Sequence, residues 1–256
     1  MGCVMRVRKQ NPFESIFQDF VLDFGGEVLP EVSQGCSADY FFRRHNLVAE
    51  LKSLTVDQTN EISSKPTPKV SSWVSANGQI PPGIVKSGQH FIAFKDMPRE
   101  IQDFWLRLLK GSTEPLIRDA NRQIRDTKSR MNLPSAKGIL IIANEGNSYH
   151  DHPDSHRRLI AEILRKRTPT GELRYPHING AVHFSIKDVK SRDEGMYFWA
   201  NLQMKQSPAE DVQPIADFQR DLQQAWYNYL ERKAGIKVRQ HTEPSPSEGA
   251  ESLGTG

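Results

Sequence analysis

Two apolar segments separated by only three residues constrain the fold of this chain more than any other feature. Residues 38–42 and 46–54 are rich in Phe, Tyr, Leu and Val, which predicts two β-strands. The connection between them consists of Arg43, Arg44 and His45. Because so short a connection joins antiparallel neighbours, the sequence predicts a β-hairpin.

Helices and further strands are predicted on both sides of the hairpin. Apolar residues recur at helical spacing over 11–24, where Asn11 can act as the N-cap, Pro12 suits the first helical position and Gly25 with Gly26 ends the helix. The same reasoning predicts helices over 98–110, 114–131, 156–167 and 211–233, and strands near 27–29 and over 138–143, 180–186 and 196–204. This mixture of elements predicts an α/β fold.

The predicted organisation is one domain, residues 1–235, followed by a disordered tail at 236–256. The tail is rich in Ser, Pro, Gly and Glu and cannot support a hydrophobic core. Within the domain, residues 55–97 are predicted to form an insertion, since Ser, Thr, Pro, Asn and Gly dominate most of this stretch. Such an insertion is either a specificity loop or a flexible connection, and composition does not choose between the two.

Composition and charge argue against several classes of protein. No apolar run approaches the roughly 18 residues that cross a bilayer, and no signal peptide or complete myristoylation signal is recognised, so we expect a cytoplasmic protein that does not enter a membrane. Cys3 and Cys36 are too few for a disulfide framework or a cysteine-based zinc site. The net charge of +3 and the isoelectric point of 8.8 permit nucleic-acid binding without requiring it.

The hairpin carries charged residues in a pattern that suits metal-assisted chemistry. Alternation along a strand places Glu50 and Lys52 on one face and turns Leu51 toward the core, while Asp39 lies on the partner strand. Two carboxylates then converge, and Mg²⁺ prefers such oxygen ligands together with water. The Lys52 ammonium can orient a metal-bound water or stabilise charge on a phosphoryl group, so the pattern favours phosphodiester hydrolysis.

This pattern resembles the PD-(D/E)xK nuclease superfamily, the restriction-endonuclease-like enzymes. The resemblance consists of Ser37-Ala38-Asp39, ten intervening residues, and then Glu50-Leu51-Lys52. It implies a core of helix, three strands, helix and strand, which corresponds to 11–24, 27–29, the hairpin, 114–131 and 138–143 and covers about residues 11–145. The implied fold is a mixed sheet flanked by helices, with a C-terminal strand-helix extension. One departure is Ala38, which stands where the family has proline.

The resemblance also implies the roles of individual residues. Asp39, Glu50 and the Leu51 carbonyl would bind Mg²⁺, with Mn²⁺ as a substitute, and Lys52 would serve the attacking water. A glutamate on the first helix would face the metal, with Glu14 the first candidate and Glu27 the weaker one. A polar residue on the second core helix would lie near the phosphate, with Gln123 first and Asn121, Arg122 and Lys128 as alternatives.

The implied substrate is nucleic acid, and DNA in particular. A homodimer is one arrangement open to an enzyme that cuts both strands, although no apolar stripe predicts it. Two other interpretations stay open. One is a solvated hairpin face whose cross-strand ion pairs contribute about 0.2 to 1 kcal/mol each. The other is a non-catalytic protein that uses the same scaffold to bind nucleic acid or another subunit.

Histidine, basic and tryptophan residues elsewhere each have a structural and a functional interpretation. His150, His152 and His156 lie among Asp residues and suit either a metal cluster or, more commonly, a polar loop in which Asp154 or Ser155 caps a helix. His177 and His183 have the same two interpretations. Two predicted basic faces could follow a phosphate backbone, namely Arg118, Arg122, Arg125, Lys128 and Arg130, and Arg157, Arg158, Arg165, Lys166 and Arg167. Core positions are favoured for Trp73, Trp105, Trp199 and Trp226.

Overall fold

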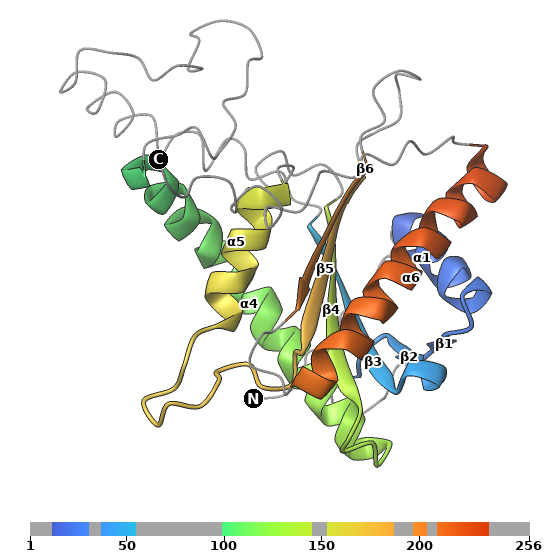
Figure 1. The fold of residues 1–256 in the computed structure, drawn as a ribbon, viewed down its shortest axis with the longest axis horizontal. Helices are drawn as coiled ribbons and strands as arrows, with labels where there is room; N and C mark the ends of the chain where they lie inside the picture. The colour runs from blue at the N-terminus through green and yellow to red at the C-terminus, as the bar shows by residue number, and fades with distance from the viewer. Residues whose placement is uncertain are drawn as a thin grey trace, which may run out of the picture.

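A single mixed sheet with helices on both faces forms the described part of the chain. The computed structural model describes residues 12–30, 37–54, 99–144, 153–186, 197–203 and 209–235. Within these ranges six strands pair in the order β1-β2-β3-β4-β5-β6, and four α-helices pack around them (Figure 1). The predicted α/β class and the mixed sheet flanked by helices are therefore confirmed. The predicted insertion at 55–97 and the tail at 236–256 lie outside the described residues.

The strands are mixed in direction. The sheet contains β1 (Glu27–Val28), β2 (Tyr40–Phe42), β3 (Leu47–Leu54), β4 (Lys137–Asn144), β5 (Gly180–Ile186) and β6 (Tyr197–Gln203). Neighbouring strands are antiparallel except β3 with β4 and β4 with β5, which are parallel. Parallel neighbours need a crossover, and α4 (Arg99–Arg130) and α5 (Pro153–Leu164) supply the two. Since β1 has only two residues, the other five strands form most of the sheet.

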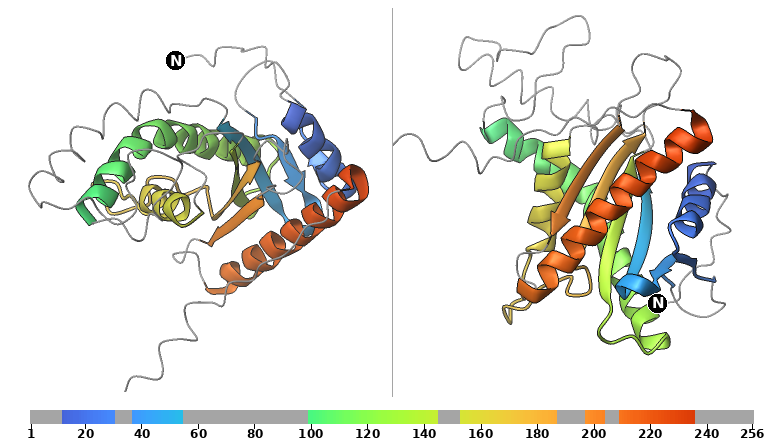
Figure 2. Two further views of the ribbon diagram at one scale, coloured as in Figure 1. Left: turned by 90° about the horizontal axis from the view of Figure 1, so that it is seen from above. Right: turned by 45° about the vertical axis from the view of Figure 1, so that its right-hand side comes forward.

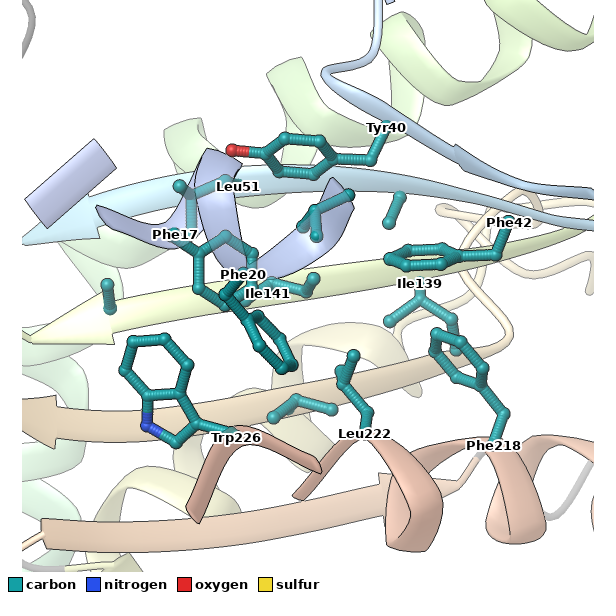
Figure 3. Packing of buried hydrophobic residues seen from close by; sticks show 14 of the residues in the cluster. Phe17, Phe20, Tyr40, Phe42, Leu51, Ile139, Ile141, Phe218, Leu222 and Trp226 are labelled. Atoms are coloured by element: carbon teal, nitrogen blue, oxygen red, sulfur yellow. The ribbon is translucent and has the colours of Figure 1, made fainter. Parts of the chain in front are cut away.

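The helices form two layers around the sheet. α1 (Pro12–Asp23) and α6 (Ala209–Ala234) cover one face, and α4 with α5 covers the other (Figure 2). The α1/α6 layer is aromatic: the ring of Phe20 lies 5.0 Å from that of Trp226, and Phe42 lies 4.9 Å from Phe218 (Figure 3). Edge-to-face pairs at such separations stabilise a core beyond the burial of area alone. Trp226 is therefore a core residue, as predicted. Trp73 and the side chains of Trp105 and Trp199 lie outside the part of the chain that the structure describes.

The predicted hairpin is present, with a left-handed residue before its second strand. β2 and β3 pair in the register Tyr40 with Ala49 and Phe42 with Leu47. Arg43–His45 forms one turn of 3-10 helix, and Asn46 follows with φ of 49°. Asparagine tolerates this conformation better than most residues, so β3 begins at Leu47, one residue after the predicted start.

The two helices predicted over 98–110 and 114–131 are one continuous helix in the structure. α4 runs through Gly111 and Pro115 without a break. Shortly before the proline, the hydroxyl groups of Ser112 and Thr113 donate to the carbonyl oxygen of Leu109 at 3.0 and 2.8 Å. The buried stripe continues across the expected break and outweighs the local helix-breaking residues. Its members are Leu106, Leu109, Thr113, Ile117, Ala120 and Ile124.

The next helix is displaced from its predicted bounds of 156–167. α5 begins at Pro153, a residue suited to the first helical position, and ends at Leu164. Asp154 and Ser155 thus lie in the first turn and are not its caps. The chain then forms an isolated bridge between Arg167 and Leu173. The expectation that Arg165, Lys166 and Arg167 share a helical face with Arg157 and Arg158 is therefore wrong.

Within the described residues, no helix has the length and apolar character needed to cross a membrane. The helices are amphipathic instead, with apolar sides in the two core clusters and polar sides toward solvent.

A pair of glycine substitutions tests the packing of β4. Gly138 lies against the segment before β5, and a methyl group there would overlap the carbonyl oxygen of His177. Gly138→Ala should lower the free energy of unfolding by about 3 kcal/mol, the upper part of the usual overpacking cost. Gly111→Ala, with open space around it in α4, should raise it by about 0.5 to 1 kcal/mol. Urea unfolding measures both, and a Gly138→Ala protein as stable as wild type would contradict this packing.

Candidate active site

The hairpin places Asp39 and Glu50 opposite one another. Asp39 immediately precedes β2, and continuing the register of Tyr40 with Ala49 sets it across from Glu50. Leu51 belongs to the core cluster under α1 and α6, so Glu50 and Lys52 on either side of it face α4. Glu50 is 0% exposed and the side chain of Lys52 is 11% exposed. The interpretation of these residues as a solvated hairpin face is therefore wrong.

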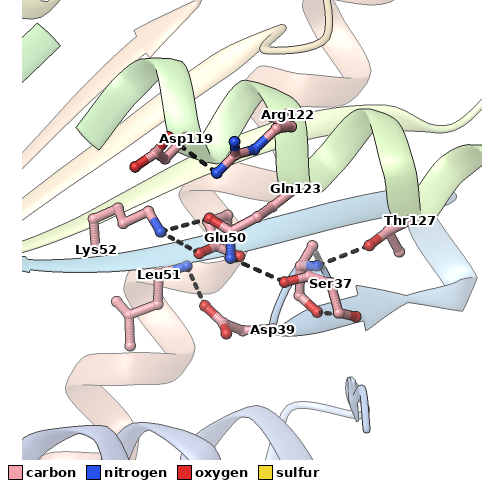
Figure 4. Close-up of polar contacts among 10 residues, drawn as sticks. Ser37, Asp39, Glu50, Leu51, Lys52, Asp119, Arg122, Gln123 and Thr127 are labelled. Carbon is pink, nitrogen blue, oxygen red and sulfur yellow. Dashed lines mark hydrogen bonds and ion pairs between the residues drawn. The ribbon is translucent and has the colours of Figure 1, made fainter. Parts of the chain in front are cut away.

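Direct hydrogen bonds join the site residues (Figure 4). The Lys52 ammonium donates to Oε1 of Glu50 at 2.6 Å and to Oε1 of Gln123 at 2.6 Å. The carboxylate of Asp39 accepts from the backbone N–H of Leu51 at 2.8 Å through Oδ2. Within an antiparallel pair, the N–H and C=O of one residue point to the same neighbouring strand. The Leu51 carbonyl therefore points to the side of β3 on which Asp39 lies.

Helix α4 also contacts the two residues that precede Asp39. Gln123 donates from Nε2 to the carbonyl oxygen of Ser37 at 3.0 Å, and Arg130 donates to the Ser37 hydroxyl at 2.8 Å. The N–H of Ala38 donates to Oγ1 of Thr127 at 2.7 Å. A proline at this position, as in the family that the sequence resembles, would have no N–H to donate. Alanine at position 38 thus makes a backbone contact with α4 that a proline could not make.

Thr127 is a residue that the sequence reasoning missed. It is fully buried on the same side of α4 as Ala120 and Ile124. A polar residue within an apolar stripe needs a hydrogen-bond partner, and that was the signal available in the sequence. The identity of the partner was not available, because Ala38 lies 89 residues away along the chain.

The four candidates on the second core helix occupy different surroundings. Gln123 contacts Lys52, whereas Asn121 accepts a hydrogen bond from the backbone N–H of His177 at 3.0 Å. Arg122 pairs with Asp119 at 3.2 Å on an exposed part of the helix. Lys128 is half-buried, near enough to Lys137 for the two ammonium groups to repel. The structure thus brings Gln123 and none of its alternatives into contact with Lys52.

The two glutamate candidates near the N-terminal helix lie elsewhere. Glu14 is half-buried in the first turn of α1, a helix that packs on the opposite face of the sheet from Glu50 and Lys52. Glu27, on β1, pairs with Arg43 at 2.7 Å, and this contact lowers the pKa of the Glu27 carboxyl. Glu14 therefore belongs to the helix layer opposite Glu50, and Glu27 is engaged by Arg43.

The donor atoms present suit a hard cation. Asp39, Glu50 and Lys52 bring two carboxylates and one ammonium, a formal net negative charge, and the ligand atoms of the two carboxylates are oxygens. Among the described residues, no group of three or more His, Cys, Asp and Glu side chains could hold a metal. An octahedral Mg²⁺ here would therefore need the Leu51 carbonyl, water or substrate oxygens to complete its shell. The residues present fit Mg²⁺ in that mode.

Of the histidines considered as metal ligands, the structure describes the side chains of His177 and His183. His150 and His152 lie outside the described residues, as does the side chain of His156. His183 is buried on β5, in register with Ile142 of β4. Burial lowers the pKa of His177, and the nearby cations of Lys128 and Arg125 lower it further.

Local acidic partners engage some residues of the two predicted basic faces. Arg125 pairs with Asp126 at 2.8 Å, and Arg158 lies 3.4 Å from Asp103. Lys166 donates to Glu114, a carboxylate that also accepts from the hydroxyl of Tyr175. Burial and this contact raise the pKa of Tyr175 to about 12. Part of the positive charge is therefore locally compensated, which weakens these faces as phosphate-binding surfaces.

Comparisons of the chain with models of protein families, with curated proteins and with solved structures find no match. The interpretation of the site therefore depends on its own geometry and chemistry.

A double substitution tests the buried pair of Glu50 and Lys52. Lys52→Met should lower the free energy of unfolding by about 3 kcal/mol, because it removes the ammonium beside a fully buried carboxylate. Combining it with Glu50→Gln should recover most of that loss, since no buried charge then remains. Urea unfolding in EDTA measures both proteins. Arg220→Met, which removes an exposed ion pair with Asp217, should cost less than about 1 kcal/mol. Equal losses in the single and double variants would contradict the pairing.

Lys128 gives a second, pH-dependent prediction. Burial, aided by the charge of Lys137, lowers the pKa of Lys128 to about 8 from its ordinary value of 10.5. Between these values the folded protein holds fewer protons than the unfolded chain, so its stability rises with pH. Lys128→Met should therefore be more stable than wild type at neutral pH, and the difference should shrink as pH rises from about 8 to 10.5.

Denaturant unfolding across that pH range measures the difference. Lys110→Met is the matched control, since it removes an ammonium that lies 3.6 Å from Glu162 and should not raise stability at neutral pH. A Lys128→Met protein that is less stable than wild type at neutral pH would show that burial does not penalise this ammonium.

Proposed function

We propose that this protein is a Mg²⁺-dependent nuclease that hydrolyses phosphodiester bonds in DNA. The observation that carries the proposal is the contact of Lys52 with both Glu50 and Gln123, while Asp39 lies across the hairpin from Glu50. The Glu50 carboxylate, the Lys52 ammonium and the Gln123 amide thus contact one another beside Asp39, although Gln123 is 71 residues from Lys52 along the chain. This combination suits binding a hard cation next to a negatively charged phosphate.

In the proposed reaction Asp39, Glu50 and the Leu51 carbonyl hold Mg²⁺, for which Mn²⁺ can substitute. The bound ion supplies a Lewis acid for the phosphoryl oxygen and lowers the pKa of a bound water. Lys52 would serve the attacking water and stabilise the negative charge that develops on the phosphoryl group. Gln123 holds Lys52 in position, since its Oε1 accepts a hydrogen bond from the ammonium.

The order of the elements supports a restriction-endonuclease-like fold for residues 12–144. α1, β1, β2, β3, α4 and β4 follow one another as helix, three strands, helix and strand, the order implied by the resemblance in the sequence. β5, β6 and α6 then extend the same sheet and cover it, in the manner of a C-terminal extension. A homodimer would allow such an enzyme to cut both strands of a duplex.

A second candidate is a non-catalytic protein that binds nucleic acid or another subunit through the same scaffold. One observation favours it: in the described ranges, no third carboxylate or histidine joins Asp39 and Glu50 in a group able to hold a metal. Binding of nucleic acid that is independent of Mg²⁺ and unaffected by Asp39→Asn would distinguish this candidate from the nuclease.

Cleavage assays test the proposed activity. Purified full-length protein is incubated with linear and circular double-stranded DNA, single-stranded DNA and RNA, in Mg²⁺, Mn²⁺ or EDTA. We expect cleavage of DNA with either metal and none in EDTA. Lys52→Met should reduce the cleavage rate about a hundredfold to ten-thousandfold. Asp39→Asn should reduce it by more than about a hundredfold, because changing a group that supports a metal ligand already costs about ten- to a hundredfold.

Asp217→Asn is the control for these variants, because Asp217 lies on α6 in an exposed pair with Arg220. It should keep the wild-type rate, and circular dichroism at the assay temperature confirms that each variant is folded. Metal-dependent cleavage that persists in Asp39→Asn, or no cleavage of any polymer by the wild type, would overturn the proposal.

A further inference from the structure

The segment that carries Asp39 into the site is attached to α4. Ser37 and Ala38 precede β2, whose ladder begins at Tyr40. Three hydrogen bonds join them to one flank of α4. Gln123 and Arg130 donate to Ser37, and the N–H of Ala38 donates to Thr127. Residues 123, 127 and 130 are separated by four and three positions, the spacing that aligns side chains along one side of a helix.

The contact with Thr127 is the most enclosed of the three. Thr127 is 0% exposed and Ala38 is 1% exposed, within the apolar cluster between the sheet and α4. At this depth neither the N–H of Ala38 nor the Thr127 hydroxyl can exchange its partner for water. The bond therefore restrains the backbone one residue before Asp39.

Asp39 needs such a restraint because of the charge opposite it. Asp39 and Glu50 face each other across the hairpin, and like charges at directly opposed positions disfavour one another. The Asp39 carboxylate is drawn toward β3 by the N–H of Leu51 at 2.8 Å. A neutral bond to the main chain before Asp39 keeps its carboxylate near Glu50 without adding a charge that would compete with a cation.

We propose that Thr127, assisted by Arg130, is a positioning residue that holds Asp39 in place for Mg²⁺ binding. The inference rests on the proposed function and deepens it, since it assigns a role to α4 that involves no contact with substrate. Thr127 acts through the backbone of Ala38, and Arg130 acts through the hydroxyl of Ser37. As a result, the separation between the carboxylates of Asp39 and Glu50 is set before Mg²⁺ binds.

Conservative substitutions of Thr127 in the full-length protein test this role. Thr127→Val keeps the shape and removes the acceptor, whereas Thr127→Ser keeps the acceptor. Thr113→Val is the matched control, because Thr113 is equally buried in α4 but donates to Leu109 within its own helix. Calorimetric titration with MgCl₂, without nucleic acid, measures the dissociation constant, and thermal unfolding in EDTA measures stability.

We expect Thr127→Val to weaken Mg²⁺ binding about tenfold or more, as is usual when a group that orients a metal ligand is removed. Thr127→Ser and Thr113→Val should bind Mg²⁺ as wild type does, even where Thr113→Val lowers the unfolding temperature. The amide of Leu51 provides a readout without metal. Its hydrogen exchange, followed by NMR, should be faster in Thr127→Val and unchanged in Thr113→Val, since Asp39 would no longer be held beside it.

Arg130→Met changes an exposed contact and should not prevent folding. It therefore tests the positioning role even if Thr127→Val does not fold. It should weaken Mg²⁺ binding about threefold, the effect of one lost exposed hydrogen bond. Its control, Arg125→Met, removes a cation from another side of the same helix and should bind Mg²⁺ as wild type does.

The outcomes separate the two proposals. Wild-type Mg²⁺ affinity in Thr127→Val, or in Arg130→Met if Thr127→Val is unfolded, overturns the positioning role. Loss of binding in Asp39→Asn under the same conditions would then leave the proposed metal site intact. Wild-type protein that binds no Mg²⁺ overturns both the site and the positioning role.

Discussion

The buried ion pair between Glu50 and Lys52 is the interaction on which the site depends. A carboxylate that is fully removed from water is costly unless an opposite charge and hydrogen bonds accompany it. Lys52 meets this requirement at 2.6 Å, and its ammonium in turn requires the Gln123 amide. β3 does not supply all of these partners, so α4 must cross β3 at the position where Gln123 reaches Lys52. The position of α4, the longest helix among the described residues, is thus linked to one buried charge.

Helix α4 therefore has two roles in the same length of chain. Its apolar stripe packs on the sheet, and its polar flank reaches the hairpin through Gln123, Thr127 and Arg130. On the opposite face, aromatic residues of α1 and α6 pack against β2, β3 and β4 and prevent the strands from moving away from α4. The hairpin is thus held between two layers. Such a rigid support favours preorganised chemistry, in which ligands already have their working separation.

Local patterns in the sequence determined the elements that build the site. Apolar residues at helical spacing predicted the helix that begins near Pro12, and a three-residue connection predicted the hairpin. Alternation along the second strand placed Glu50 and Lys52 on one face, because side chains of a strand point to opposite sides in turn. The same local geometry placed Asp39 on the partner strand, and the register of the folded hairpin then set it opposite Glu50. These features depend on residues within about fifteen positions of one another, so the sequence carries them directly.

Tertiary structure decided what surrounds those residues. The sequence contained four polar candidates on α4, and only packing of the helix selected Gln123 as the partner of Lys52. It also contained a charged hairpin that suited either a solvated face or a buried site, and the layers around β3 decided for burial. Thr127 had no visible role until the fold brought it to Ala38, and α4 remained continuous through Pro115 because its buried stripe did not end there. The physical reason is the same in each case: local periodicity sets the direction of a side chain, whereas its partner and its exposure depend on contacts between segments 71 to 89 residues apart.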